Sequence, residues 1–301
     1  MAKSMKKKLY ALIDTETTMR NGLVFDFAYI FFDKAGQVYG KHSFLFKDVM
    51  AVEEPFFKEK IANYWKLVEK GLIKPVSFKV ARYHFNRVLA KYNALGFEIV
   101  LCAYNATFDV GVLGKTTAAL MGVDPVTDKH FKFLTQPVKL FDVMHGWAAT
   151  CPKEYGKFAP FNEPKPGKKP TGNISTTAEN VYRYESGDPS FVERHVAFED
   201  AIIEKDIMLR ILARKKKMHI VTNPADFAAH PWKIVQERCS EYIKARPDHP
   251  HRAVAQSLPE IRDFVPDYTV SKNHRDKVGG RDNFLNNTGE LPEPVDKVSA
   301  S

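Results

Sequence analysis

The sequence predicts an α/β fold in which a mixed β-sheet carries helices on its faces. Short apolar runs typical of buried strands come first and then alternate with longer segments whose apolar residues recur at helical spacing. This is the order of a layered α/β domain. The chain has 301 residues, of which 44% are hydrophobic, enough for one sizeable core and an appendage.

Three strands are expected at the N-terminus, at residues 9–14, 24–32 and 38–46. The first is an apolar run that follows a basic start, and the other two are rich in Phe, Tyr, Val and Leu. The segment DKAG at residues 33–36 has turn-forming residues and would join the second strand to the third.

Helices and strands are expected to alternate through the middle of the chain. We predict helices at residues 55–70 and 77–95, a strand at 99–104, a helix from 109 to about 121, a strand at 138–143 and a helix starting near 196. The last of these has an apolar face through residues 203–212, with charged residues elsewhere, which is typical of a helix packed on a core.

Two regions depart from this pattern. Prolines, glycines and lysines at residues 151–190 predict an irregular insertion, which either borders the cleft and touches the substrate or is a disordered surface loop. Toward the C-terminus, residues 231–245 predict a helix and residues 286–301 predict disorder. We therefore expect a domain at 1–217 that contains the insertion, and an extension at 218–301 that is helical in part and then disordered.

Two carboxylates, Asp14 and Glu16, follow the first apolar run in the sequence IDTETT. Side chains two residues apart on a strand point to the same face, so these carboxylates would repel each other unless a cation lay between them. A solvated strand end is the alternative, because an acid-x-acid triplet is common by chance. The buried strand before the pair favours a metal site.

A second strand also ends in polar residues, in the sequence AYNATFD. Asp109 lies where the next helix should begin, so it is either a helix-capping residue or a group that faces the ligand site. Ligands bind at the carboxyl ends of strands in open α/β sheets, and two strands that both end in acids fit that rule.

The third fragment, HVAFEDA, contains His195 and Asp200. Five residues on a continuous helix rotate a side chain by roughly 140° from the first, so both cannot lie on one face of the same helix. We therefore expect His195 in the preceding loop, with Asp200 pointing into the cleft from the helix. Taken alone, each is an ordinary surface residue; it is the order of all three fragments that indicates a site.

These fragments resemble the three exonuclease motifs of the DEDDh group of the DnaQ-like 3′-5′ exonucleases, a family of the ribonuclease H-like superfamily. The spacing of His195 and Asp200 is that of the histidine branch, and LFDVMHGWA, which contains Asp142, is similar to the family's fifth-strand segment. The matches span residues 8–213. The resemblance implies a mixed five-stranded sheet flanked by helices.

The resemblance also implies a set of catalytic roles. Asp14, Glu16, Asp109 and Asp200 would hold two divalent metal ions, Mg²⁺ or Mn²⁺, roughly 3.5 to 4 Å apart. His195 would act as general base on the attacking water, a role suited to a side chain whose reference pKa is about 6.5.

Substrate contacts are implied at the residues that follow the first acid and within the second motif. Thr15, Thr17 and Thr18 are candidates for contacts to sugar or base. Asn105 and Phe108 are candidates either for positioning the penultimate nucleotide or for supporting the strand that carries the metal ligands. A core role for Phe108 is the alternative, because buried phenylalanine is common. Many family members have a basic residue directly after the histidine, whereas this chain has Val196. Whatever that residue contributes is therefore either absent here or comes from Arg194, on the other side of the histidine.

The bulk properties agree with a nucleic-acid substrate. The formal net charge is +9 and the isoelectric point is near 9.2, which suits a polyanionic partner, although basic residues also serve solubility. The three cysteines show neither a pairing pattern nor zinc spacing, so we expect a reducing compartment such as the cytoplasm. We expect no association with membranes, because no apolar segment is long enough to span one and none resembles a signal peptide.

The function expected from the sequence is a metal-dependent 3′-5′ exonuclease that releases nucleoside 5′-monophosphates from single-stranded 3′ ends. DNA is the expected substrate ahead of RNA, and a polymerase or another replication protein is a candidate partner. An RNA-directed exonuclease and a non-catalytic nucleic-acid-binding or polymerase-binding module are the alternatives, the latter disfavoured by the intact set of five residues. Pathway and oligomeric state stay open.

Overall fold

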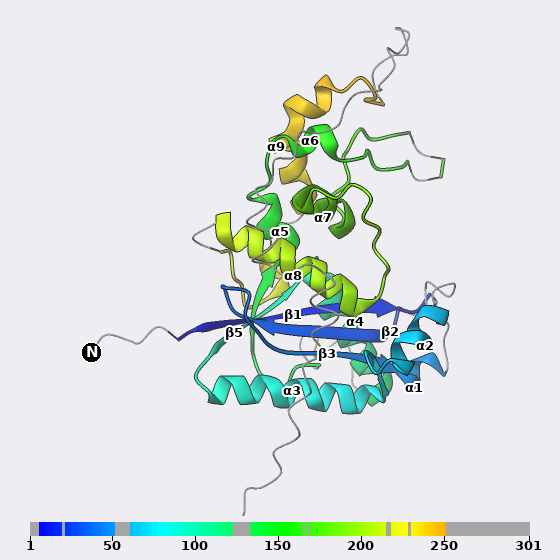
Figure 1. The fold of residues 1–301 in the computed structure, drawn as a ribbon, viewed down its shortest axis with the longest axis vertical. Coiled ribbons are helices and arrows are strands. Elements are labelled where there is room, and N and C mark those ends of the chain that lie inside the picture. The colour runs from blue at the N-terminus through cyan, green and yellow to red at the C-terminus, as the bar shows by residue number, and fades with distance from the viewer. Residues whose placement is uncertain are drawn as a thin grey trace, which may run out of the picture. The chain divides into compact units, whose positions relative to one another are not determined.

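A computed structural model describes residues 6–19, 22–51, 61–122, 133–164, 166–167, 169–214, 218–227 and 230–250. Its centre is a six-stranded sheet with the order β4-β3-β2-β1-β5-β6 (Figure 1). β2 is antiparallel to both of its neighbours, whereas the other pairings of the sheet are parallel. The expected α/β class is therefore confirmed.

The first three strands form an antiparallel meander. β1 (Lys8–Thr17), β2 (Val24–Phe32) and β3 (Val38–Phe46) lie where the apolar pattern predicts them. β1 continues past its apolar run, so the first two acids lie within the strand rather than after it. The predicted turn joins β2 to β3: Gly36 has a positive φ of 85°, and its amide donates to the carbonyl of Asp33.

The remaining strands complete the sheet on both sides. β5 (Glu98–Ala103) pairs with β1, and β6 (Lys139–Asp142) pairs with β5. β4 (Lys74–Val76) adds a short parallel edge strand beside β3. β4 is not among the five strands predicted from the sequence. A strand of only three residues with a central proline has no readable alternation, and proline is tolerated at a sheet edge.

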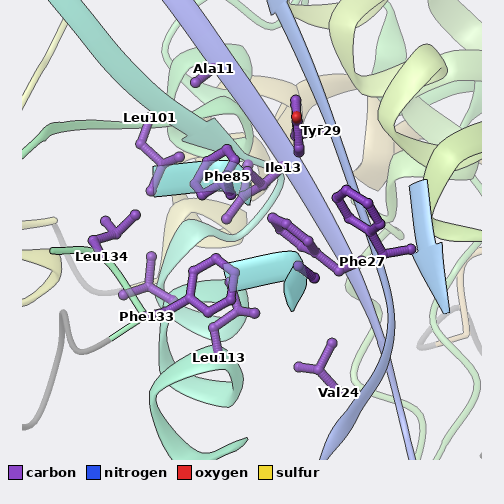
Figure 2. Close-up of a cluster of buried hydrophobic side chains, with 14 of the residues drawn as sticks. Ala11, Ile13, Val24, Phe27, Tyr29, Phe85, Leu101, Leu113, Phe133 and Leu134 are labelled. Atoms are coloured by element: carbon purple, nitrogen blue, oxygen red, sulfur yellow. The ribbon is translucent and has the colours of Figure 1, made fainter. Parts of the chain in front are cut away.

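Helices cover both faces of the sheet. α3 (Phe78–Ala94) and α4 (Ala106–Met121) bury their apolar residues on one face, against the odd-numbered side chains of β1. Figure 2 shows this core, in which Phe27 packs edge to face against both Phe85 and Phe133 near Leu113. α8 (Ala197–Arg214) packs on the opposite face, over β1 and β2. Because side chains alternate along β1, the even-numbered residues Asp14 and Glu16 face α8.

Shorter helices complete the described chain. They are α1 (Lys47–Met50), α2 (Ile61–Glu69), α5 (Val143–Ala148), α6 (Tyr155–Phe158), α7 (Ala178–Ser186), η2 (Pro224–Asp226) and α9 (Pro231–Ala245). α2 falls within the helix expected at 55–70, of which residues 55–60 lie outside the described chain. α9 has the predicted bounds, and the tail from residue 251, including the segment predicted to be disordered, lies outside the described residues.

The predicted insertion at 151–190 is more ordered than expected, because it contains α6 and α7. Thr177 caps the start of α7 and Gly187 ends it with a positive φ of 70°. Inside α7, the buried Glu185 accepts hydrogen bonds from the Trp147 indole and from both terminal nitrogens of Arg214. These bonds connect α7 to α5 and α8. The prolines in this segment predict an irregular loop, but α7 is ordered and packs on the neighbouring helices.

α9 packs against α5 and α6. Cys151 and Cys239 lie in this contact as free, buried thiols whose sulfurs are 3.9 Å apart. The two cysteines are 88 positions apart in the chain, so their spacing does not indicate this approach. The domain boundary expected after residue 217 stays a prediction; Val221 pairs with Leu140 beside the sheet in an isolated β-bridge. No helix of the described chain is long and apolar enough to cross a membrane.

Candidate active site

The site lies where β1 runs beyond the end of its parallel neighbour. The β1–β5 pairing stops at Leu12 opposite Cys102, whereas β1 continues to Thr17. Asp14 and Glu16 are half-buried on this overhang, on the face covered by α8. Glu16 is opposite Asp26 of β2, just before an irregularity in the strand register. The overhang gives both carboxylates room at the carboxyl end of the sheet.

α8, which covers this face of the sheet, contributes further acidic side chains to the site. Asp200 lies in its first turn, where the amide of Asp200 donates to the carbonyl of Val196. Among the described residues, one group of potential ligand atoms gathers closely enough to hold a metal ion: Glu16, His195 and Asp200, whose atoms lie within 4.8 Å of one another. Residues separated by up to 184 positions thus meet at one point.

His195 lies in the loop just before α8, as the residue spacing predicts. Its Nδ1 is 4.0 Å from Glu16 Oε1 and 4.0 Å from Glu193 Oε2, and its side chain is 35% exposed. Its backbone φ is +51°, a left-handed conformation that is uncommon for a residue with a side chain. The imidazole is therefore open to solvent on one side and faces carboxylates on the other.

Asp109 approaches the site from the opposite layer. It is buried in the first turn of α4, where its Oδ1 accepts a 2.8 Å hydrogen bond from the hydroxyl of Thr15. Asn105, not Asp109, occupies the N-cap position, with a positive φ of 69°. Asp109 is therefore not the N-cap residue, although it lies in the first helical turn, where an acidic side chain is favoured. Asp142 at the end of β6 accepts a hydrogen bond from the amide of Ala106, which fixes the start of α4.

The carboxylates repel one another strongly. Burial, followed by the charges of Glu204 and Asp109 and then of Asp200 and Glu16, raises the pKa of Asp14 well above its usual range. The pKa of Asp200 is raised in the same way, first by burial and then by Glu193 and Glu16.

Burial raises the pKa of Asp109 to about 8, opposed by the hydrogen bond from Thr15. A divalent cation among these oxygens would reverse the repulsion, so Asp14, Glu16, Asp109 and Asp200 fit hard, oxygen-preferring ions.

Three further acidic residues belong to the site and were missed by the sequence analysis. Glu204 is one helical turn after Asp200, is buried, and accepts a 3.2 Å hydrogen bond from the amide of Tyr104. Asp26 is fully buried on β2, and Glu193 precedes His195. The four-residue spacing of Asp200 and Glu204 could have indicated a shared helix face. Nothing local distinguishes Asp26 from a surface acid.

The expected substrate-binding residues differ in how far their side chains are exposed to solvent. Phe108 is 46% exposed and Asn105 is also exposed, so the core role considered for Phe108 is wrong. Thr17 is half-buried at the end of β1. Thr15 is buried against Asp109, and Thr18 is buried with its hydroxyl accepting from the amide of Leu23.

The two residues that flank His195 also differ in their exposure to solvent. Val196 is buried, whereas Arg194 is exposed and lies 3.4 Å from Glu199. Arg194 is thus the basic residue next to the histidine, and a contribution from it to the site stays a prediction.

No family model and no curated protein match the chain. Among solved structures, it is similar to Exonuclease X in complex with 5′ overhanging duplex DNA, at 15% identity and a TM-score of 0.36, covering 75% of this chain and 99% of that one. A full-length 3′-exonuclease is similar at 12% identity and a TM-score of 0.45, covering 72% of this chain and 64% of that one.

E. coli Exonuclease I in complex with a dA16 oligonucleotide is similar at 15% identity and a TM-score of 0.39, covering 69% of this chain and 41% of that one. The chain thus spans less than two thirds of the last two structures. Likeness at this level says nothing of chemistry, which depends on the residues of the site itself.

Proposed function

We propose that this protein is a metal-dependent 3′-5′ exonuclease that hydrolyses single-stranded ends, DNA ahead of RNA, to nucleoside 5′-monophosphates. The observation that carries the proposal is the convergence of Glu16, His195 and Asp200 within 4.8 Å, with Asp14 and Asp109 in the same electrostatic cluster. A purely structural domain gains nothing from burying mutually repelling carboxylates at a sheet edge.

The four carboxylates Asp14, Glu16, Asp109 and Asp200 would hold two Mg²⁺ or Mn²⁺ ions. Bound there, the ions would supply an activated water and neutralise charge on the phosphodiester. His195 would take the proton from that water, because its imidazole is partly exposed and already faces Glu16. Thr15 holds Asp109 in place, and we assign it this positioning role instead of a direct contact with substrate.

The exposed side chains near Asp109 are the proposed substrate contacts. Phe108 offers an exposed ring, and stacking on an aromatic ring stabilises an unpaired base by roughly 1–3 kcal/mol whatever its identity. Asn105 and Thr17 add polar groups near the ends of β5 and β1. The basic character of the chain favours a polyanion. The proposal includes a polymerase or another replication protein as a partner that delivers the strand, and a binding experiment tests this.

The experiment follows a 5′-labelled single-stranded DNA in the presence of Mg²⁺. We expect a descending ladder of labelled products that EDTA abolishes. His195→Ala should lower turnover by roughly 10² to 10⁴ while leaving divalent-ion binding intact, because a general base contributes a factor of this size. Asp200→Asn should abolish both activity and ion binding. Asp226→Asn, which changes an exposed acid in η2, is the matched control and should behave as the wild type.

The outcomes separate the alternatives. Release of the label as a 5′-terminal nucleotide would rule out the proposed polarity. Retention of wild-type rates by His195→Ala and Asp200→Asn would rule out the site. A matched RNA oligonucleotide degraded faster than the DNA would make the RNA-directed enzyme correct. Binding of the strand without hydrolysis would support the non-catalytic module.

A further inference from the structure

The backbone around His195 is held from both sides by two buried residues of other elements. His195 has a positive φ, a conformation that persists only where the surroundings impose it. On one side, the Tyr64 hydroxyl donates a 3.0 Å hydrogen bond to the carbonyl of His195. On the other, Asp26 Oδ2 accepts a 2.9 Å hydrogen bond from the amide of Ala197. Val196, between these two contacts, is buried.

Both holding residues are rigidly placed. Tyr64 is 1% exposed in α2, and its ring packs edge to face on Phe25, 5.5 Å between centroids. Asp26 is 0% exposed and lies opposite Glu16 in the β1–β2 pair. In Figure 1, α2 lies beside the end of the sheet where α8 begins. Because Asp26 is tied to the strand that carries Glu16, it sets the distance between that carboxylate and the start of α8.

We infer that Tyr64 and Asp26 are positioning residues that impose the left-handed conformation of His195 and so aim its imidazole at Glu16. The inference rests on the proposed function and deepens it, because it makes the docking of α2 a requirement for an active His195. Neither side chain needs to touch the substrate. Each acts on the backbone: Tyr64 on the carbonyl of His195, and Asp26 on the first amide of α8. Removing the Tyr64 hydroxyl should therefore act mainly through His195.

A double-mutant cycle tests this with Tyr64→Phe, which removes the hydroxyl and keeps the ring. We expect kcat to fall roughly 10- to 100-fold with KM unchanged, as small misplacements of a catalytic group do. In the His195→Ala background the same change should cost nothing further, because the group it positions is gone. Tyr83→Phe, at a tyrosine that is 67% exposed on α3, is the matched control. If Tyr64 is merely structural, the loss of kcat in the double variant should be the product of the losses in the two single variants. That result would overturn the inference, as would a Tyr64→Phe variant that is as active as the wild type.

Asp26 is tested by rescue. Asp26→Asn keeps an oxygen that can accept from the Ala197 amide, whereas Asp26→Ala does not. We expect the asparagine variant to retain at least ten times the kcat of the alanine variant. Equal losses in the two variants would show that the hydrogen bond is not what matters at this position.

One readout is independent of catalysis and keeps this inference separate from the proposed function. Amide hydrogen exchange over residues 193–198 should be roughly fivefold faster in Tyr64→Phe than in Tyr83→Phe, because one restraint on the loop is lost. If the wild type shows no nuclease activity, the proposed function fails while this measurement still decides whether Tyr64 holds the loop. Unchanged exchange would overturn the positioning role.

Discussion

At the scale of single residues, neighbouring positions of β1 have different roles because a strand directs alternate side chains to opposite faces of the sheet. Asp14 and Glu16 face α8 and Asp200, whereas Thr15 faces the other layer and donates to Asp109. One short segment therefore connects both layers of the fold to the site. Asp109 reaches the cluster from α4 only because β5 ends where β1 continues.

Removing the hydroxyl of Thr15 tests this connection. Thr15→Val keeps the shape of the side chain but removes the hydroxyl donor from the buried Asp109 carboxylate. A hydrogen bond to a charged group contributes roughly 1.5–3 kcal/mol, so we expect divalent-ion affinity to fall about tenfold or more. Titration calorimetry with Mn²⁺ measures this. Thr117→Val is the control, because that hydroxyl donates to the carbonyl of Leu113 within α4. Equal effects of the two changes would contradict the role given to Thr15.

At the scale of elements, α8 is the part of the fold that joins the site to the rest of the molecule. Its start carries Asp200 and is held by Asp26, and its last turn carries Arg214, which is bound by Glu185 of α7. α5 in turn contacts α8 and α9. The outer helices therefore support the helix that carries the site without contributing to the described acidic cluster.

The contact of α6 with α9 is close enough to be tested with a single methyl group. A Cβ at Gly156 would lie 2.9 Å from both Cβ and the carbonyl oxygen of Cys239. Gly156→Ala should therefore destabilise the protein by about 1–3 kcal/mol in a denaturant titration. Gly111→Ala, inside α4 with open space around the added Cβ, should stabilise it by about 0.4–1 kcal/mol. A Gly156 variant as stable as the wild type would show that the α6–α9 contact is looser than described.

At the scale of the whole molecule, the chain has a positive net charge, whereas its candidate site is acidic. The net charge of +9 attracts a polyanion, and the buried carboxylates would repel it unless cations neutralise them. Binding of metal ions and binding of substrate are thus expected to support each other. The same charges make the stability of the whole fold depend on pH and on divalent ions.

The sign of the pH dependence follows from the raised pKa values. Asp26 has a pKa of about 7 and Asp109 of about 8, mainly through burial, whereas both would ionise near 4 in the unfolded chain. Between these values the folded state holds more protons, so the free energy of unfolding decreases as pH rises. His42, whose pKa burial lowers to about 4, contributes in the opposite direction below about pH 6.5. The interval from pH 6.5 to 8.5 therefore isolates the carboxylates.

In EDTA, we expect the melting temperature to fall between pH 6.5 and 8.5. Mg²⁺ should raise it more at pH 8.5 than at pH 6.5, because the ion replaces the protons that the carboxylates have lost. Each kcal/mol corresponds to roughly 2–4 °C for a protein of about this size. Calorimetry at both pH values gives the comparison, and Asp109→Asn should flatten the fall in EDTA. A stabilisation by Mg²⁺ that is the same at both pH values would contradict the assignment of these residues as ligands.

Much of the architecture is readable from local pattern. β2, β3 and α9 have the predicted bounds, because each is a long run whose ends are marked by polar residues or proline. β4 and α7 are not predicted, since one is too short for periodicity and the other lies among prolines. His195 in a loop before α8 follows from spacing alone, because five residues cannot return a helix to the same face.

The sequence by itself determined the class of fold, the candidate ligands Asp14, Glu16, Asp109 and Asp200, and the loop position of His195. The class of fold and the loop position depend on periodicity and spacing, which are local properties, whereas the set of four ligands is what the resemblance of the three motifs implies. Only the tertiary structure decided that Thr15 holds Asp109, that Glu204 joins the acidic cluster, and that Tyr64 and Asp26 hold His195. Each of those interactions joins residues that are 94 or more positions apart along the chain. Packing alone brings such groups together, and no local pattern records it.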